Sequence, residues 1–386
     1  MKIGITTFYY KVHNYGANLQ AYALCRVLGK MGHDAEQICF NTSDGFPEFK
    51  LSFPQNIIIS IKVFIARILS VICHPRYYYC YKRRLSAVEY FLKDKIPHSK
   101  RVYALKNIKE AQHEYDLFIT GSDVVWSPKT NSSIFFLRFL DHNKPKLAYA
   151  PSLGTEVLSK EEKKQFKHDL ESFIDISTRE KRVVPLLEEA SGRKVSYCID
   201  STLLLDFADW NTICSKRIVN SSYVFCYFLG NNEEAKGLAI GYARSKSMRL
   251  VNIPYYWNYY SDFSNFGDVK LSDISAADFI SLIKYADCVF TDSFHACVFS
   301  EIFSTPFFAV KRGKNDSLSV RLIDFLSETG LLSHYCDNRN KMTIDYVNKN
   351  LKIDFNQVQK RLEELREPSI KYLKDNIEFV CQKLNS

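Results

Sequence analysis

Short apolar runs alternate with amphipathic stretches along most of the chain. The run at 2–7 predicts a first strand, and apolar positions at helical spacing in 18–31 predict a helix that Gly32 ends. Further strands are predicted at 34–40, 115–120, 146–151, 174–177, 195–199, 223–228, 249–253, 287–290 and 305–310, and further helices at 159–173 and 278–286. Alternating strands and helices are typical of parallel sheets with right-handed crossovers, so the expected fold class is α/β.

The alternation divides into two halves of similar length, which predicts two Rossmann-like domains facing a cleft. We place the N-terminal domain at 1–172, with a helical basic insert at about 55–110, and the C-terminal domain at 173–340. A helical tail at 341–386 follows. By analogy with two-domain folds of this kind, its last helix crosses back onto the first domain; the alternative is a contact in a dimer.

The insert concentrates the positive charge of the chain. Between Lys62 and Lys109 there are twelve Lys or Arg residues and two acidic ones, while the whole chain carries a formal net charge of +9. A strongly apolar stretch at 57–73 leads into this basic segment. Apolar, aromatic and basic residues in this order favour contact of 57–109 with an anionic membrane surface. The alternative is a core helix followed by a solvated basic helix; no nucleic-acid motif accompanies the charge, so we expect no nucleic-acid partner.

The cysteines indicate a reducing compartment. The eleven cysteines are scattered, with no C-x-x-C pair and no Cys/His cluster at metal-ligand spacing. The segment 1–7 has the pattern of a strand and not of an export signal. We therefore expect a cytoplasmic protein, with an association to the inner face of the membrane left open, and neither a disulfide framework nor a metal site.

Polar turns follow most of the predicted strands, which is where ligands bind in open α/β sheets. In the first half these turns contain Asn14, Tyr15, Gly16, Gly121, Ser122 and Asp123. In the second half they contain Arg179, Asp292, Ser293, His295, Lys311 and Arg312. Arginine binds phosphate and carboxylate groups bidentately, so the cations of the second half favour a small anionic substrate.

Simpler interpretations of these turns stay open. In the first of these, the only role of Asp292 or Ser293 is to cap the following helix, and His295 is a packed core residue. In the simpler interpretation of Arg179, its side chain forms an ion pair with Glu180 or Glu188 on a surface helix. In the simpler interpretation of 121–123, these residues form a turn that caps a helix and bind no ligand.

Several stretches of the chain resemble the polysaccharide pyruvyl transferase family. They occur in the family's order and span residue 1 to about 330, leaving out the basic insert and the tail. The stretches are 14–24 (NYGANLQAYAL), 115–126 (YDLFITGSDVVW), 149–154 (YAPSLG), 176–181 (ISTREK), 199–205 (IDSTLLL), 286–296 (ADCVFTDSFHA) and 305–309 (TPFFA).

The resemblance implies a two-domain fold similar to GT-B glycosyltransferases. It implies transfer of a pyruvyl group from phosphoenolpyruvate to a sugar hydroxyl pair, as a ketal, in cell-surface polysaccharide biosynthesis. Phosphoenolpyruvate is a co-substrate, no cofactor is expected, and the saccharide acceptor is free or lipid-linked. The family's donor-binding arginine maps onto Arg179 and its histidine onto His295.

On this basis each candidate residue receives a role. Catalytic roles fall to His295, the acid or base, and Asp123, which orients acceptor hydroxyls. Donor-binding residues are Arg179, Asp292, Ser293, Lys311 and Arg312. Acceptor-binding residues are Asn14, Tyr15, Gly16, Gly121 and Ser122.

Two positions depart from the family pattern. Ser293 stands where characterised members resemble one another in having arginine, and Ser201 stands where the family has proline. The missing guanidinium removes one bidentate anion contact, which leaves Lys311 or Arg312 to hold the donor or points to a different donor. The alternatives are a GT-B-type nucleotide-sugar glycosyltransferase and a non-catalytic membrane-surface scaffold in polysaccharide assembly. A serine hydrolase built on Ser293 is disfavoured, because the chain has no G-x-S-x-G elbow there.

Overall fold

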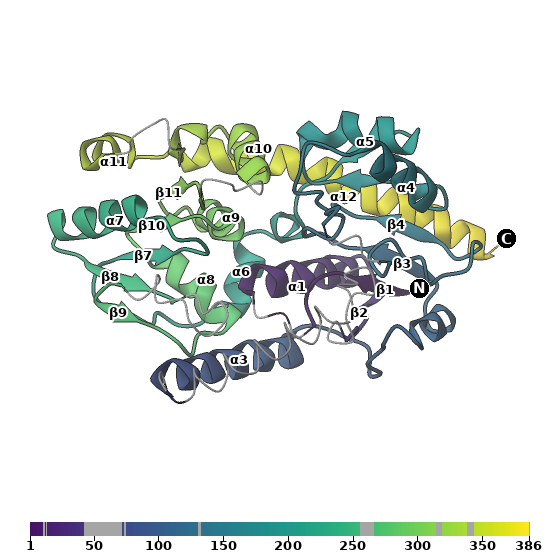
Figure 1. Ribbon diagram of the computed structural model, residues 1–386, viewed down its shortest axis with the longest axis horizontal. Helices are drawn as coiled ribbons and strands as arrows, with labels where there is room; N and C mark the ends of the chain where they lie inside the picture. Colours follow the sequence, from purple (N-terminus) through teal and green to yellow (C-terminus); the bar gives the residue numbers. More distant parts are fainter. Residues whose placement is uncertain are drawn as a thin grey trace.

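The computed structural model describes residues 1–10, 12, 14–41, 72, 75–129, 133–254, 266–313, 319–337 and 343–385. Most of the apolar stretch of the insert, at 57–71, lies outside these residues. Every strand pair among the described strands is parallel, and helices separate the strands along the chain. The predicted α/β class is therefore confirmed (Figure 1).

The first sheet has four strands in the order β2-β1-β3-β4. These strands are β1 (Lys2–Thr6), β2 (Asp34–Gln37), β3 (Leu117–Thr120) and β4 (Lys146–Ala148). The helix α1 (Tyr15–Lys30) connects β1 to β2, and Asn14 caps its start by accepting a hydrogen bond from the backbone of Ala17. β3 is buried at every position, which explains its continuous apolar run.

Residues 174–178 lie against the edge of this sheet beyond β4. The Ile174 N–H donates to the Lys146 carbonyl at 2.7 Å. The next elements along the chain are α4 (Lys160–Leu170), β5 (Ser177–Thr178), α5 (Val184–Ser191), β6 (Ser196–Tyr197), the 3₁₀ turn η4 (Ser201–Leu204) and α6 (Phe207–Ile213). The start of the predicted C-terminal half thus packs on the first sheet, and the boundary after residue 172 stays a prediction.

The second sheet has six strands in the order β12-β11-β10-β7-β8-β9. Its strands are β7 (Tyr223–Tyr227), β8 (Arg249–Asn252), β9 (Val269–Lys270), β10 (Cys288–Thr291), β11 (Phe307–Val310) and β12 (Tyr335–Cys336). The accompanying helices are α7 (Glu233–Ser245), α8 (Ala276–Lys284), α9 (Phe294–Ile302) and α10 (Ser319–Thr329). The predicted strand at 287–290 is confirmed as β10, and the helix expected after its polar turn is α9.

The basic insert contains one long described helix, α3 (Pro75–Lys95), which packs on α1 and α8. Arg84 is its buried anchor: the guanidinium donates to the Pro254 carbonyl at 2.9 Å and lies 4.9 Å from the ring of Tyr15. The Tyr15 ring stacks on Phe279 of α8, with ring centroids 4.9 Å apart. The apolar core is therefore continuous from the first sheet to the second, through α1 and α8.

The chain ends in two helices, α11 (Ile344–Asn350) and α12 (Phe355–Asn385). Near its start α12 contacts the second half, because the Gln359 side chain donates to the Glu301 carbonyl at 2.6 Å. Farther along, the Tyr372 hydroxyl donates to the Ala148 carbonyl of β4 at 2.9 Å. The last helix thus crosses from the second half back to the first, as expected (yellow in Figure 1).

Candidate active site

Polar side chains from four separate loops meet where the two halves join. Ser122 and Asp123 follow β3, Arg179 follows β5, Asp200 directly precedes η4, and His295 lies in the first turn of α9. The backbone brings them together because each follows a strand or opens a helix on the side where α/β folds bind ligands. Asp200, which the sequence analysis had not singled out, lies at the centre of the group.

Arg179 and Asp200 form a buried ion pair through Nη1 and Oδ2, with side chains only 1% and 0% exposed. The Ser122 hydroxyl donates to the same Asp200 oxygen at 2.6 Å. The other oxygen of Asp200 accepts from the backbone N–H and the hydroxyl of Thr202, at 3.0 and 2.7 Å. These hydrogen bonds offset the desolvation of the buried pair. Arg179 is therefore part of an internal network, and its interpretation as a surface ion pair is wrong.

The network fixes the charges of the pair. Burial alone would raise the pKa of Asp200, but the Arg179 guanidinium, the His295 imidazole and the Ser122 hydroxyl outweigh it and hold that pKa well below its usual range. Burial likewise disfavours the charged form of Arg179, yet the carboxylates of Asp200 and Asp123 raise its pKa. Both side chains are therefore charged at neutral pH.

His295 lies between Asp200 and the start of α1. Its Nε2 is 3.8 Å from Asp200 Oδ2, which is too long for a hydrogen bond. On the other side of the ring, a Cβ added at Gly16 would lie 2.0 Å from Nδ1, so only glycine fits there. The imidazole is thus fixed in position by packing, while Nε2 faces the Arg179 and Asp200 pair.

Asp123 has an unusual backbone conformation for a residue with a side chain, with φ at 89°. Its Oδ1 accepts from the Val124 N–H at 2.8 Å and lies 3.5 Å from Arg179 Nη2. The same oxygen is 3.9 Å from Nη1 of Arg321, which comes from α10. Strained residues of this kind occur preferentially at functional sites. The arrangement brings Asp123 beside Arg179. A turn that only capped a helix would not need this contact.

Asp292 has both carboxylate oxygens occupied by backbone groups. It accepts from the N–H groups of Leu229 and Gly230, each at 2.7 Å. Arg312 Nε lies 3.8 Å from Asp292 Oδ2. Asp292 therefore fixes the loop after β7 and positions Arg312, and it does not cap α9. Its direct contact with a donor stays a prediction.

Ser293 is the N-cap residue of α9, but its side chain makes no capping hydrogen bond. Its backbone N–H donates to the Thr291 hydroxyl at 3.0 Å. The Lys311 carbonyl accepts from the Asn232 side chain at 3.0 Å. Roles of the Ser293 and Lys311 side chains in donor binding stay predictions.

The predicted acceptor residues of the first half differ in their surroundings. Asn14 uses its side-chain oxygen as the cap of α1, and Gly121 packs closely against Ile5 and Leu24. The Tyr15 ring is fully buried between the halves. Its burial makes Tyr15 a core residue of the interface, and any contact of this ring with an acceptor stays a prediction.

Two buried nitrogen donors at the centre of the site have no hydrogen-bond partner among the described residues: Nε of Arg179 and Nε2 of His295. Buried donors without partners are rare in folded proteins and cost free energy. Both nitrogens belong to side chains that contact Asp200 Oδ2. The pair of donors therefore fits a ligand with several acceptor oxygens, such as a phosphate or a carboxylate.

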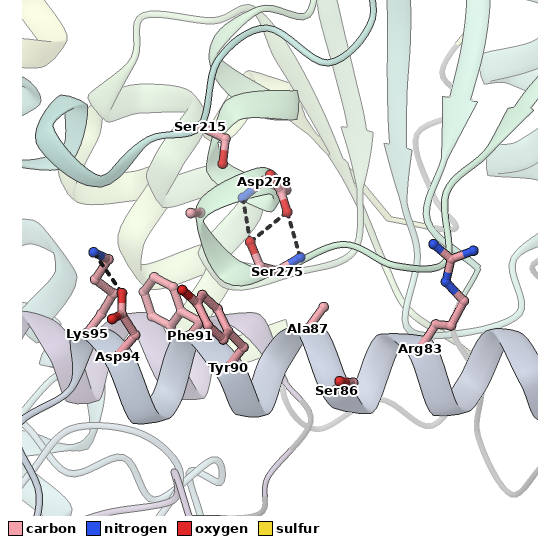
Figure 2. A pocket seen from close by; sticks show the side chains of 11 residues that line it. Arg83, Ser86, Ala87, Tyr90, Phe91, Asp94, Lys95, Ser215, Ser275 and Asp278 are labelled. Carbon is pink, nitrogen blue, oxygen red and sulfur yellow. Dashed lines mark hydrogen bonds and ion pairs between the residues drawn. The ribbon is translucent and has the colours of Figure 1, made fainter.

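A pocket of ≈ 550 Å³ lies elsewhere, between α3 and the start of α8 (Figure 2). Ser275 and Asp278 bond to each other in the capping box of α8, and Lys95 pairs with Asp94 on α3. Its polar groups are thus largely satisfied by one another, and Arg179 and His295 do not line it. We therefore place the candidate active site on the polar cluster and not on this pocket.

Comparison with solved structures shows the fold. Over 99% of this chain and 97% of the other, the structure is similar to a protein from Listeria monocytogenes assigned as a UDP-N-acetylglucosamine 2-epimerase, with a TM-score of 0.55 and 10% sequence identity. A UDP-GlcNAc 2-epimerase from Neisseria meningitidis bound to UDP-GlcNAc gives a TM-score of 0.51 and 8% identity, over 98% of this chain and 99% of that one. Together with the two parallel sheets, this similarity confirms the predicted GT-B-like fold.

Comparison with sequences identifies the family. A search of curated proteins gives no match. The sequence model of the family described as polysaccharide pyruvyl transferase matches residues 14–314. This range includes Asp123, Arg179, Asp200 and His295. The chain therefore belongs to the polysaccharide pyruvyl transferase family and is a transferase.

Proposed function

We propose that this protein transfers a pyruvyl group from phosphoenolpyruvate to a pair of hydroxyl groups on a saccharide. The observation that carries the proposal is the pair of buried, unpartnered donors on Arg179 and His295, within the matched family range. A donor with a phosphate and a carboxylate supplies acceptor oxygens for such nitrogens. Cell-surface polysaccharide biosynthesis is the process that this family suggests.

Both protons of the acceptor hydroxyl groups are accounted for in the products. Two hydroxyl oxygens of the saccharide form bonds to C2 of phosphoenolpyruvate, and the bond from C2 to the phosphate oxygen breaks. The methylene carbon C3 gains one proton and becomes a methyl group, while the second hydroxyl proton leaves with hydrogen phosphate. The site must therefore supply an acid for C3, a base for the hydroxyls and cations for the phosphate.

The residues of the cluster match these requirements. We assign the protonation of C3 to Nε2 of His295, because histidine side chains commonly serve as general acids in enzymes. Arg179 holds the phosphate as negative charge develops on it, together with the N-terminus of α9. Asp200 holds the Arg179 guanidinium in place through the ion pair between them. General acid–base catalysis of this kind accelerates a reaction by about 10²–10⁴-fold.

The acceptor approaches from the first half of the molecule. Asp123, beside Arg179, orients an acceptor hydroxyl and accepts its proton. Gly16 leaves room for the imidazole of His295 itself, and Gly121 and Ser122 shape the loop that carries Asp123. Whether the saccharide is free or lipid-linked, its hydroxyl pair must reach Arg179 and His295 together.

Binding of the donor tests the proposal. Thermal unfolding is measured with phosphoenolpyruvate and, separately, with UDP and GDP sugars. A ligand at 100 times its dissociation constant stabilises a protein by about 2.7 kcal/mol. Stabilisation by phosphoenolpyruvate that is lost in Arg179→Ala supports the proposal. The absence of any shift with phosphoenolpyruvate would count against it.

The GT-B-like fold keeps one alternative open. The Neisseria meningitidis epimerase was solved with UDP-GlcNAc, although a similarity at 8% identity shows the fold alone. A nucleotide-sugar glycosyltransferase would be stabilised by UDP or GDP sugars and not by phosphoenolpyruvate. The same thermal measurement therefore separates the two functions.

We also propose that α3 contacts an anionic membrane surface. Tyr79 and Tyr90 are 60% and 70% exposed and lie on nearly the same side of the helix, and Lys82 is exposed beside them. Aromatic and basic side chains favour the headgroup region of a bilayer. Among the described residues no helix combines the length and apolar character needed to cross a membrane.

A further inference from the structure

Arg321 brings a second buried guanidinium into the candidate active site. It lies on α10, beyond residues 14–314 that match the family model, and its side chain is 10% exposed. Its Nη1 is 3.9 Å from Asp123 Oδ1, and Arg179 Nη2 is 3.5 Å from the same oxygen. One carboxylate oxygen therefore lies near two arginines from separate elements, the segment after β5 and the helix α10.

The same two arginines face one aromatic ring. The guanidinium carbons of Arg179 and Arg321 are 4.9 and 5.9 Å from the ring centroid of Phe294. Phe294 immediately precedes His295 at the start of α9. The ring thus holds both guanidinium groups close to the imidazole that we assign to catalysis.

The charges around Arg321 favour an anion. Burial and the neighbouring guanidiniums of Arg179 and Arg312 lower the pKa of Arg321 to about 10, against the opposing effect of the Asp123 carboxylate. Arg321 therefore remains a cation at neutral pH. Charge-assisted hydrogen bonds measure about 2.7–2.9 Å, so the contacts of Asp123 with Arg179 and Arg321 are both loose. An additional anionic group between the two guanidiniums would relieve their mutual repulsion.

We propose that Arg321 is a further donor-binding residue, which binds the carboxylate of the donor while Arg179 binds its phosphate. This inference rests on the proposed function, since it takes phosphoenolpyruvate as the donor. Two guanidinium groups beside one small molecule would bind its two anionic groups separately. Arg321 thereby supplies a guanidinium that residue 293, a serine, does not.

The attachment of α10 provides a matched control. Arg182 Nε pairs with Asp324 Oδ1 of α10 at 2.9 Å, and the Arg182 N–H donates to the other Asp324 oxygen at 3.1 Å. Arg182→Gln weakens the attachment of α10 without removing Arg321. A general effect of loosening α10 would therefore show in Arg182→Gln as well as in Arg321→Gln.

The experiment measures the affinity of the full chain for phosphoenolpyruvate and for inorganic phosphate by calorimetry. Arg321→Gln should bind phosphoenolpyruvate about 10- to 100-fold more weakly, the loss expected for charge-assisted hydrogen bonds. Its affinity for inorganic phosphate should change less than about two-fold, because phosphate alone uses Arg179. Arg321→Lys should be intermediate, since lysine keeps the charge and loses the fork. Arg182→Gln should bind both ligands as the wild type does.

Three results would overturn the inference, and they are distinguishable. If Arg321→Gln binds phosphoenolpyruvate as tightly as the wild type, Arg321 does not contact the donor. If Arg182→Gln loses the same affinity, the effect belongs to the attachment of α10. If the folded wild type binds no phosphoenolpyruvate, the proposed function itself fails and this inference fails with it.

Discussion

Gly16 of α1 lies directly against the imidazole of His295 on α9, so closely that a Cβ at position 16 would be 2.0 Å from Nδ1. The contact joins the first turn of α1 in the first half to the first turn of α9 in the second. It orients Nε2 of His295 toward Asp200, at 3.8 Å. Glycine is therefore required at position 16 to place the proposed acid.

Gly16→Ala should therefore impair catalysis without unfolding the protein. The methyl group would displace the His295 ring, and turnover should fall toward that of His295→Ala, by about 10²-fold or more. Gly29→Ala is the matched control, because it lies on the same helix and a Cβ there meets no atom within 4 Å. Steady-state kinetics of both variants, with circular dichroism, make the measurement. Full activity in Gly16→Ala would contradict the proposed placement of His295.

Arg179→Lys should mainly weaken donor binding. Lysine keeps the positive charge beside Asp200 but cannot supply the planar fork, so KM for phosphoenolpyruvate should rise about 10- to 100-fold. Stability should fall less than in Arg179→Ala, which leaves Asp200 as an uncompensated buried carboxylate. Initial rates at varied donor concentration decide the matter. An unchanged KM in a folded variant would show that the phosphate binds elsewhere.

Glu301→Gln should stabilise the protein at neutral pH. Glu301 is fully buried in α9, where it accepts a hydrogen bond from Thr329 at 3.0 Å and burial raises its pKa well above the usual range. Above the pKa of the unfolded chain, about 4.3, the folded state binds more protons than the unfolded state. The stability of the wild type therefore falls as pH rises through this window, relative to a variant without the carboxyl group.

Thermal unfolding between pH 4 and pH 8 measures this difference. The variant should exceed the wild type by about 1–3 kcal/mol at neutral pH, and the two curves should converge toward pH 4. Because glutamine retains an acceptor for the Thr329 hydroxyl, the comparison isolates the effect of the ionisable carboxyl group. A constant difference across the pH range would show that Glu301 does not titrate as described.

Tyr79 and Tyr90 of α3 should contribute to membrane binding. Replacing both with serine should reduce flotation with anionic vesicles, because their exposed rings would no longer insert at the headgroups. Phe207, exposed on α6 at 48%, provides a control through Phe207→Ser. Binding of the wild type should also decrease with salt. Equal flotation of the wild type and the double variant would show that these α3 side chains do not contribute to membrane binding.

Sequence alone predicted the elements whose residues form unbroken local patterns. The buried strand β10 and the polar turn that leads to His295 are continuous in sequence, so both could be predicted from the local pattern. The central position of Asp200 could not be predicted, although Asp200 lies in the stretch 199–205 that resembles the family. Its importance depends on Arg179 and Ser122, which come from distant loops.

The surroundings of Arg179 illustrate the limit of local reasoning. Glu180 is its neighbour in sequence, yet the Glu180 carboxylate accepts hydrogen bonds from Ser152 and from the Leu153 N–H, away from Arg179. Adjacent residues in extended backbone point to opposite sides, so a sequence neighbour was the wrong partner to expect. Arg321 is farther still from any motif, and only the packing of α10 brings it to Asp123.

The origin of the methyl protons tests the central claim most directly. The protein is incubated in D₂O with phosphoenolpyruvate and a mixture of bacterial saccharides, and products are analysed by mass spectrometry and NMR. The account predicts that phosphate is released and that a saccharide gains a pyruvate ketal whose methyl group carries one deuteron, dependent on His295. Transfer of a glycosyl group from an added nucleotide sugar, with phosphoenolpyruvate unchanged, would contradict it.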